Sequence, residues 1–207
     1  MTLVESNLSH GRGDGDPKAE RYRITHVRGP MARRFRAMVT QQGGEAAWNR
    51  LLGLVGPACR ERYSRELGSF EWVEAELAAE IGETWEAYGG EGSTASRGQG
   101  AAREILDGAH PWLLRLATPW VLIQAMPRMF GFYYRGAELT LDRHVEGGAD
   151  FTLRASGYYA SWYQRGVPAW AQEALRLAGA RSAEVIHLPP GPGEAPWYHR
   201  YEARWQD

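Results

Sequence analysis

Cysteine is nearly absent from this chain, since Cys59 is the single one among 207 residues. One cysteine cannot form an internal disulfide or supply a cysteine-rich zinc site, and it agrees with a reducing compartment. Long apolar runs are also missing, because no stretch approaches the roughly 20 residues that a membrane-spanning helix requires. The polar start of the chain lacks the apolar segment of a secretory signal. These absences predict a cytoplasmic protein without a membrane partner.

Neither sign of charge is in excess. The formal net charge is -1 and the sequence pI is about 6.6, so no basic field is present to neutralise phosphates, and a nucleic-acid partner is not indicated. Lys18 is the only lysine and every other basic residue is arginine, a bias that GC-rich codon usage explains. Hydrophobic residues at 43% and charged residues at 24% are typical of a globular protein.

The chain is expected to hold one domain over residues 21–207, preceded by a mobile glycine-rich tail over 1–20. In the N-terminal half, apolar spacing predicts a short strand near 22–28 and helices over 31–39, 45–55, from Pro57 onward, and through 73–88 with Ser69 as a possible cap. Residues 91–100 are expected to form a flexible loop. The apolar stretch over 112–134 should form two or three kinked helical pieces, because it contains Pro119 and Pro127.

The C-terminal third has a clearer pattern. Alternation and the turn signal Gly147-Gly148 predict a β-hairpin over 139–154. A helix over 158–177 should end at Gly179, and a second hairpin should pair 185–188 with 198–205. The predicted fold class is therefore α+β, with an N-terminal helical half packed on a four-stranded antiparallel sheet from a β-β-α-β-β unit.

Three patterns carry a resemblance to a known family: Gly44-Glu45-x-x-Trp48-x-x-Leu51-Leu52, Phe132-Tyr133-Tyr134-Arg135-Gly136, and Ala174-Leu175-x-Leu177-Ala178-Gly179-Ala180 before Val185-x-His187. Together they resemble an uncharacterised protein family of myxobacteria. That family is similar to 4-vinyl reductase-type small-molecule-binding domains and, more distantly, to heme nitric oxide and oxygen sensors. The resemblance implies helices packed on an antiparallel sheet, a hydrophobic ligand cavity between the layers, and a tendency to form dimers.

The sequence departs from the metal-binding members of these groups. Vinyl-reductase-type relatives often carry zinc-binding cysteines near the final hairpin, whereas residues 188–197 contain none, so no metal site is predicted. The heme sensors use a tyrosine-x-serine-x-arginine signature for the propionates. The nearest match here, Tyr63-Ser64-Arg65, lacks the intervening residues. Heme is therefore not indicated, the cofactor is unknown, and a heme-type sensor is kept as an alternative.

Candidate catalytic groups are few. The six histidines show no i, i+4 pair that would place two metal ligands on one helix face, although His110 is a conceivable axial heme ligand. Asp142 and His144 lie two apart on a predicted strand, where they face the same way and either form a carboxylate–imidazole pair or remain an exposed hairpin pair. Cys59 lies near a helix start that can lower its pKa, but a packing role is the simpler interpretation. No catalytic residue is predicted.

Aromatic side chains form the best candidate site. One group belongs to the proline-kinked helices and the other to the helix on the sheet, and if they face each other they enclose an apolar cavity. The predicted ligand-binding residues are Trp112, Trp120, Phe130, Tyr133, Tyr134, Tyr158, Tyr159, Trp162, Tyr163 and Trp170, with Phe132 adding a ring to the first group. A solid aromatic core is the alternative, because protein interiors leave few voids. A similar choice applies to Arg33, Arg34 and Arg36, which form either a solvated helix face or an anion site.

Three functional hypotheses follow. The first is a non-enzymatic cytoplasmic sensor or signalling module whose hydrophobic or aromatic ligand changes helix packing, with a homodimer or signalling protein as possible partner. The second is an interaction or dimerisation scaffold of the same fold with a closed pocket. The third is an enzyme or heme-type sensor acting on a tetrapyrrole or other hydrophobic ligand. The ligand itself cannot be identified from the sequence.

Overall fold

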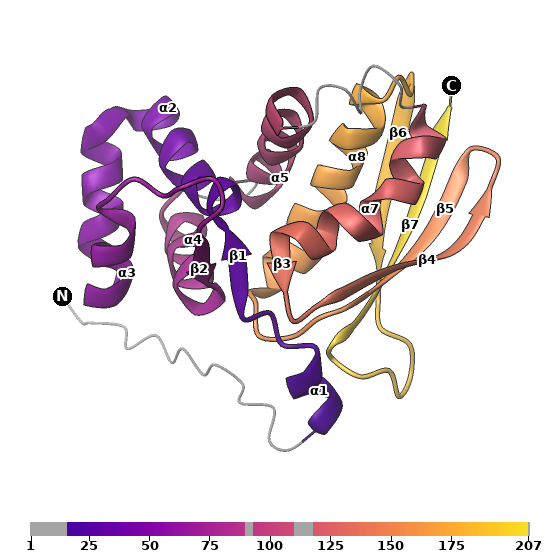
Figure 1. The fold of residues 1–207 in the computed structure, drawn as a ribbon, viewed down its shortest axis with the longest axis horizontal. Coiled ribbons are helices and arrows are strands. Elements are labelled where there is room, and N and C mark those ends of the chain that lie inside the picture. Colours follow the sequence, from indigo (N-terminus) through magenta and orange to yellow (C-terminus); the bar gives the residue numbers. More distant parts are fainter. Residues whose placement is uncertain (1–15, 90–92, 110–117, 207) are drawn as a thin grey trace.

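The computed structural model describes residues 16–89, 93–109 and 118–206. Its described part contains two antiparallel sheets and a set of helices that separate into two halves (Figure 1). The N-terminal half consists of α1 (Pro17–Arg21), β1 (His26–Arg28), α2 (Gly29–Leu54), α3 (Pro57–Tyr63), β2 (Trp72–Glu74) and α4 (Ala75–Gly89). The remaining elements are α5 (Ser93–Arg103), η1 (Glu104–Ala109), α7 (Pro119–Tyr133), β3 (Tyr134–Arg135), β4 (Glu138–Val145), β5 (Gly148–Arg154), η2 (Trp162–Gly166), α8 (Val167–Leu177), β6 (Ser182–Leu188) and β7 (Tyr198–Gln206).

The C-terminal sheet has the strand order β4-β5-β7-β6 with every pair antiparallel, which confirms the β-β-α-β-β prediction. Gly147 adopts φ +68° in the first hairpin and Gly179 adopts φ +102° after α8, both in the left-handed region that favours glycine. Apolar residues alternate along the strands, so one face of the sheet is buried. The largest side chains on that face belong to Phe151, Tyr201 and Trp205.

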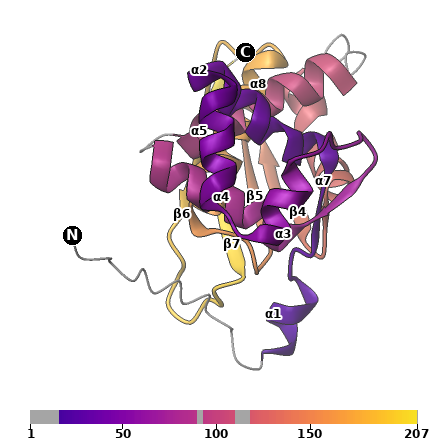
Figure 2. The ribbon, with the colours of Figure 1, turned by 90° about the vertical axis from the view of Figure 1, so that its left-hand side faces the viewer.

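Helices α7 and α8 cover this buried face, and α5 lies against α8 (Figures 1 and 2). Tyr201, which is 2% exposed, donates a hydrogen bond of 3.0 Å from its hydroxyl to the carbonyl of Tyr163 and so ties the sheet to η2. The N-terminal half packs against the other side of α5. One apolar cluster extends through both halves, which places the centre of the molecule where the helices meet the sheet.

A second, three-stranded sheet of order β2-β1-β3 joins the two halves and was not predicted. Of its strands only β1 was expected, within the short strand predicted near 22–28, and its partners are two or three residues long and far apart in sequence, so local alternation could not reveal the sheet. Residues 72–74 form β2 instead of the first turn of a helix, and α4 begins at Ala75. The prediction of a cap at Ser69 was therefore wrong. Glu71 explains the difference, because its carboxylate accepts from the backbone N–H of Gly68 at 3.0 Å and holds a turn there.

Two further helix predictions need correction. Residues 93–100, expected to belong to a flexible loop, form the first part of α5, and the described stretch around Pro127 is one continuous helix, α7, without the expected break at that proline. Thr118 caps α7, and Pro119 occupies the first turn as expected. The Gly43-Gly44 interruption predicted between two helices is present as a kink within α2, where Gly44 adopts φ +67°.

The start of the described chain is tied to the last hairpin. Residues 17–21, most of them within the range expected to be a mobile tail, form α1, and the Asp16 carboxylate accepts a 2.9 Å hydrogen bond from the indole N–H of Trp197. Within the described residues, no helix combines the length and apolar character needed to cross a membrane.

Candidate functional site

An apolar cavity of about 70 Å³ lies where the N-terminal helices meet the helices on the sheet. It is lined by Met31, Arg34, Arg97, Gly98, Ala101, Ile105, Met126, Met129, Phe130, Tyr133, Tyr134, Leu139, Trp162, Gly166, Val167 and Trp170. These residues come from α2, α5, η1, α7, β3, β4, η2 and α8, so the cavity touches nearly every element of the central core. A ligand in it would contact both halves of the molecule at once.

The walls of this cavity are well suited to change shape. Three methionines line it, and methionine is a flexible side chain that adapts to irregular spaces. Two wall segments, η1 and η2, are π-helical, a rare conformation that occurs mostly as short insertions and often at functional sites. The π-helical turn at η2 directs Trp162 inward, where its side chain is 6% exposed.

The predicted ligand-binding aromatics divide into three groups. Five of them line the cavity, namely Phe130, Tyr133, Tyr134, Trp162 and Trp170. Three others, Tyr158, Tyr159 and Tyr163, pack around Trp162 in the core behind that wall. Trp120 lies apart at 38% exposure and stacks on His144, while Trp112 falls outside the described residues. The ring of Phe132 is 42% exposed and lies under the Arg28 guanidinium, away from the cavity.

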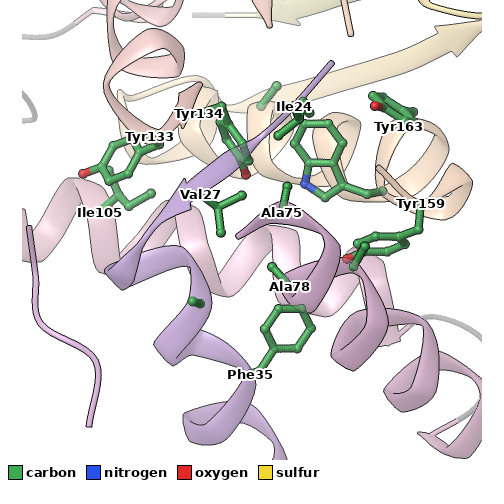
Figure 3. Packing of buried hydrophobic residues seen from close by; sticks show 14 of the residues in the cluster. Ile24, Val27, Phe35, Ala75, Ala78, Ile105, Tyr133, Tyr134, Tyr159 and Tyr163 are labelled. Atoms are coloured by element: carbon green, nitrogen blue, oxygen red, sulfur yellow. The ribbon is translucent and has the colours of Figure 1, made fainter. Parts of the chain in front are cut away.

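The aromatic cluster therefore combines the two arrangements expected from the sequence, a solid core and a cavity. Trp162 lies 5.0 Å from the ring centres of Tyr134, Tyr158 and Tyr163, so most of the cluster is solid core. The residual space lies on the side of Trp162 that faces Phe130 and α5. In Figure 3, Ile105, Tyr133 and Tyr134 lie together, and Phe35 and Tyr159 are seen further along the same buried cluster.

The most unusual lining residue is Arg97 of α5, which the sequence analysis missed. Its side chain is 7% exposed, and its guanidinium lies 4.3 Å from the ring centre of Phe35 and 5.0 Å from that of Tyr159. Burial lowers the pKa of this guanidinium, although arginine remains protonated at any physiological pH. Within the described residues Arg97 makes no hydrogen bond or ion pair. Its close contacts are cation–π contacts with the rings of Phe35 and Tyr159.

Phenol groups surround the same region. Burial raises the pKa of Tyr158 to about 12 and also raises those of Tyr63 and Tyr134, so all three phenols stay neutral at pH 7. The hydroxyls of Tyr63 and Tyr159 are buried and have no hydrogen-bond partner within the described residues. Buried polar groups are normally hydrogen-bonded, so this cluster has unused capacity to bind a polar group.

A larger surface groove of about 450 Å³ lies on the other side of α2 and includes the predicted basic residues Arg33 and Arg36. Glu45, Glu66 and Glu104 line the same groove. Arg36 pairs with Glu45, and Arg34 pairs with Glu104. Because most charged residues of the groove already have ion-pair partners, and because the smaller cavity is the more apolar of the two, the smaller cavity is the better ligand site.

The predicted pairing of Asp142 with His144 does not form. A register irregularity between Leu141 and Arg143 interrupts the alternation on which the prediction depended. The Asp142 carboxylate accepts hydrogen bonds from the hydroxyls of Thr140 and Thr152, and the His144 ring stacks against Trp120 and Trp205. Cys59 is also inert, because burial raises the pKa of its thiol to about 12 instead of lowering it.

The sheet brings together two histidines that the sequence left scattered. In the β6–β7 hairpin, Nε2 of His187 lies 3.3 Å from Nδ1 of His199, and the ring of Tyr163 stacks on His199 at 4.0 Å. Burial lowers the pKa of His199 to about 4, with the neighbouring His187 contributing, and burial lowers the pKa of His187 as well. Both imidazoles are therefore held neutral against the core.

This histidine pair predicts a specific acid sensitivity. The unfolded chain takes up protons at these residues near pH 6.5, whereas the folded chain does so at His199 only near pH 4, so stability should fall as the pH drops through that window. One such group contributes a slope of at most about 1.4 kcal/mol per pH unit. The variant His199→Phe keeps the stack on Tyr163 and should show a shallower loss in thermal melts between pH 7 and pH 4.5. Parallel curves for both proteins would contradict the prediction.

No protein-family model matches the sequence, and no curated protein sequence matches it. The fold does match solved structures. One is a mutant of the unliganded Fe(II) H-NOX protein from K. algicida, with a TM-score of 0.67 at 11% identity over 87% of this chain and 97% of that one. Another is an oxygen-binding H-NOX domain related to soluble guanylate cyclases, with a TM-score of 0.64 at 10% identity over 87% and 96%.

This chain has the H-NOX fold. The distant relation to heme nitric oxide and oxygen sensors is thus supported at the level of fold, whereas these matches do not support the resemblance to the myxobacterial family or to the vinyl reductase-type domains. Two other matched structures are described by their heme, one on heme redox potential and porphyrin distortion at a TM-score of 0.60 and one on heme distortion in the H-NOX family at 0.58, both at 11% identity.

The described residues of this chain do not fit a heme. The H-NOX-like cavity measures about 70 Å³, against roughly 300–1,000 Å³ for ordinary small-molecule sites. Its described lining contains no histidine or cysteine that could ligate iron, and no cluster of three metal-binding side chains occurs within the described residues. Tyr63-Ser64-Arg65 forms no clamp, because Ser64 bonds to the Arg60 carbonyl and Arg65 pairs with Glu71. His110 lies outside the described residues.

Proposed function

We propose that this chain is a non-enzymatic sensor or signalling domain that binds a small hydrophobic or aromatic molecule in the cavity between its helices and its sheet. The H-NOX fold supports a domain that senses a small molecule, since one matched structure is described as an oxygen-binding H-NOX domain related to soluble guanylate cyclases. The ligand here is distinct from heme, for the reasons of size and lining given above. Fold analogy alone does not define function, so the proposal depends on the site.

One observation carries the proposal: the apolar cavity is walled by both halves of the molecule and by two π-helical segments. Occupancy would push on Trp162 and the methionines and would shift α5 and α7 relative to the sheet. A ligand that binds one arrangement of these helices better than another changes the population of that arrangement. The outer surfaces of the helices then transmit the signal to a partner chain or a second copy of this one.

If a ligand occupies the cavity, a substitution that fills the cavity with a larger side chain should prevent the ligand from binding. Ala101 of α5 is 3% exposed and lines the cavity, so Ala101→Leu should occupy the space that the ligand needs. Native mass spectrometry of the purified wild-type protein should show a bound small molecule that is missing from Ala101→Leu. Ala125→Leu on α7 is the matched control, because Ala125 lies outside the lining and should leave the adduct in place.

A second function is favoured by the size of the cavity. At about 70 Å³ it holds little more than a few water-sized groups, which fits a closed-pocket scaffold that uses the fold for dimerisation. The two functions differ in the same experiment. An unliganded wild-type protein whose melting temperature does not respond to any apolar compound, together with a dimer in sedimentation, would replace the sensor proposal by the scaffold.

A further inference from the structure

Arg97 is the exception among the buried and half-buried charges of the described chain. Glu173, which is 7% exposed, pairs with Arg103 at 2.7 Å. Arg62 pairs with Glu71 and also donates to the carbonyl of Trp72 at 2.7 Å. Arg97 is buried as deeply as Glu173 but has neither an ion pair nor a hydrogen bond within the described residues.

The neighbouring carboxylate does not compensate this charge. Glu86 contributes to the electrostatic environment of Arg97, but its oxygens accept a hydrogen bond from the Ser161 hydroxyl and pair with Arg165 at 3.7 Å. The rings of Phe35 and Tyr159 stabilise the guanidinium through cation–π contacts, which contribute about 2 kcal/mol when desolvated. Removing an ion from water costs several kcal/mol, so the rings alone leave the charge under-compensated.

Arg97 lies between the cavity, which it lines together with Gly98, and the rings of Phe35 and Tyr159. A Cβ placed on Gly82 would lie 2.9 Å from Cζ of Tyr159 and 3.0 Å from Nη1 of Arg97, so a larger residue at position 82 would require both side chains to shift. Arg34, the second basic residue of the lining, is already engaged by Glu104, so Arg97 holds the free positive charge of this site.

From this arrangement we infer that the cavity binds a small apolar carboxylate, with the carboxylate paired to Arg97 and the hydrocarbon part against Met126, Phe130 and Trp162. The inference deepens the proposed function, on which it rests, by naming the class of ligand. Arginine offers a planar set of donors that matches a carboxylate in a bidentate pair.

The other anions that arginine binds suit this cavity less well. An inorganic phosphate would need polar groups around all its oxygens, whereas the lining is dominated by aliphatic, methionine and aromatic side chains. A cavity of about 70 Å³ is about half the size of an engineered apolar cavity of roughly 150 Å³ that holds benzene. An acid of two or three carbons is the size that such a space admits, with the methionines adapting to it.

The test compares propanoate with propanamide, which has the same shape and no charge. In wild-type protein the carboxylate should raise the melting temperature and bind at least about tenfold more tightly than the amide in calorimetry, because hydrogen bonds to charged groups are the stronger ones. Arg97→Met should remove this preference while melting at the same temperature as the wild type or higher, since the under-compensated charge is gone. Arg97→Lys keeps the charge without the planar donors and should retain part of the preference.

Arg62→Met is the matched control. It removes a half-buried arginine that is paired with Glu71 and lies away from the cavity, so it should lower the melting temperature and leave the preference for the carboxylate intact. Equal binding of the amide and the carboxylate to the wild type would overturn the role of Arg97 but leave the apolar site standing. Binding of neither probe, in a protein that also carries no co-purified molecule, would overturn the proposed function itself.

Discussion

Trp162→Ala should lower the stability of the protein by about 3–5 kcal/mol, the range for removing a large buried aromatic side chain. The indole contacts Phe130, Tyr134, Tyr158 and Tyr163, so the substitution removes the common neighbour of the aromatic core. For a domain of this length, each kcal/mol corresponds to roughly 2–4 °C in melting temperature. Thermal and chemical denaturation should both detect the loss.

The same substitution should convert the small cavity into a site for a larger molecule. Because Trp162 forms part of the cavity wall, its removal joins the vacated volume to the existing space. Apolar cavities of that kind bind apolar molecules, so free indole should raise the melting temperature of Trp162→Ala and have no such effect on the wild type.

Trp120→Ala serves as the control for this rescue. Trp120 is 38% exposed and lies outside the lining, so its removal opens a surface notch instead of an enclosed hole. We expect a smaller loss of stability and no response to indole. If Trp162→Ala is destabilised but indole leaves its melting temperature unchanged, the space beside Trp162 collapses when it is enlarged, and the cavity is not a preformed site.

The C-terminal unit could be predicted from the sequence because its signals are local. Gly147-Gly148 marks a two-residue turn, the strands alternate, and Gly179 stops the helix, so neighbouring residues determine each feature. The order of the four strands follows once the two hairpins lie side by side. Only the contact between β5 and β7 required information from distant parts of the chain.

The most important failure concerns α5, and its cause is physical. Glycine, serine and threonine dominate residues 91–100, and glycine destabilises an isolated helix by roughly 1 kcal/mol relative to alanine. Packing against α8 outweighs that preference here. A usable signal was nevertheless present, because Gly98, Ala101, Ala102, Ile105 and Leu106 follow the i, i+3, i+4, i+7, i+8 spacing of one helix face.

Because residues 91–100 were predicted to form a loop, the burial of Arg97 was not predicted either. An arginine in a loop is ordinarily solvated, so nothing about it suggested a buried charge. The histidine pair was missed for a related reason, since His187 and His199 meet only through the register of the last hairpin. The aromatic residues could be predicted as a cluster, but which of them line a space depended on packing that composition does not reveal.

Gly98→Ala should destabilise the protein by at least about 2 kcal/mol, although alanine is the better helix former by roughly 1 kcal/mol. A Cβ at this position would overlap the carbonyl oxygen of Gly166 and lie 3.1 Å from the backbone nitrogen of Trp170. Both obstacles are backbone atoms, so α5 and α8 would have to separate. The neighbouring Arg97 would move with α5, and we expect weaker binding of carboxylate probes as well as a lower melting temperature.

Gly131→Ala is the same substitution in another helix, and it should raise the stability of the protein instead of lowering it. Gly131 lies within α7, and a Cβ there meets nothing within 4 Å, so only the helix preference acts and stability should rise by about 0.4–1 kcal/mol. Urea denaturation of the two variants side by side measures the difference directly. If both substitutions stabilise the protein to a similar degree, α5 does not approach the backbone of Gly166 and Trp170 closely. The position of Arg97 in the cavity wall would then be less fixed than the structure indicates.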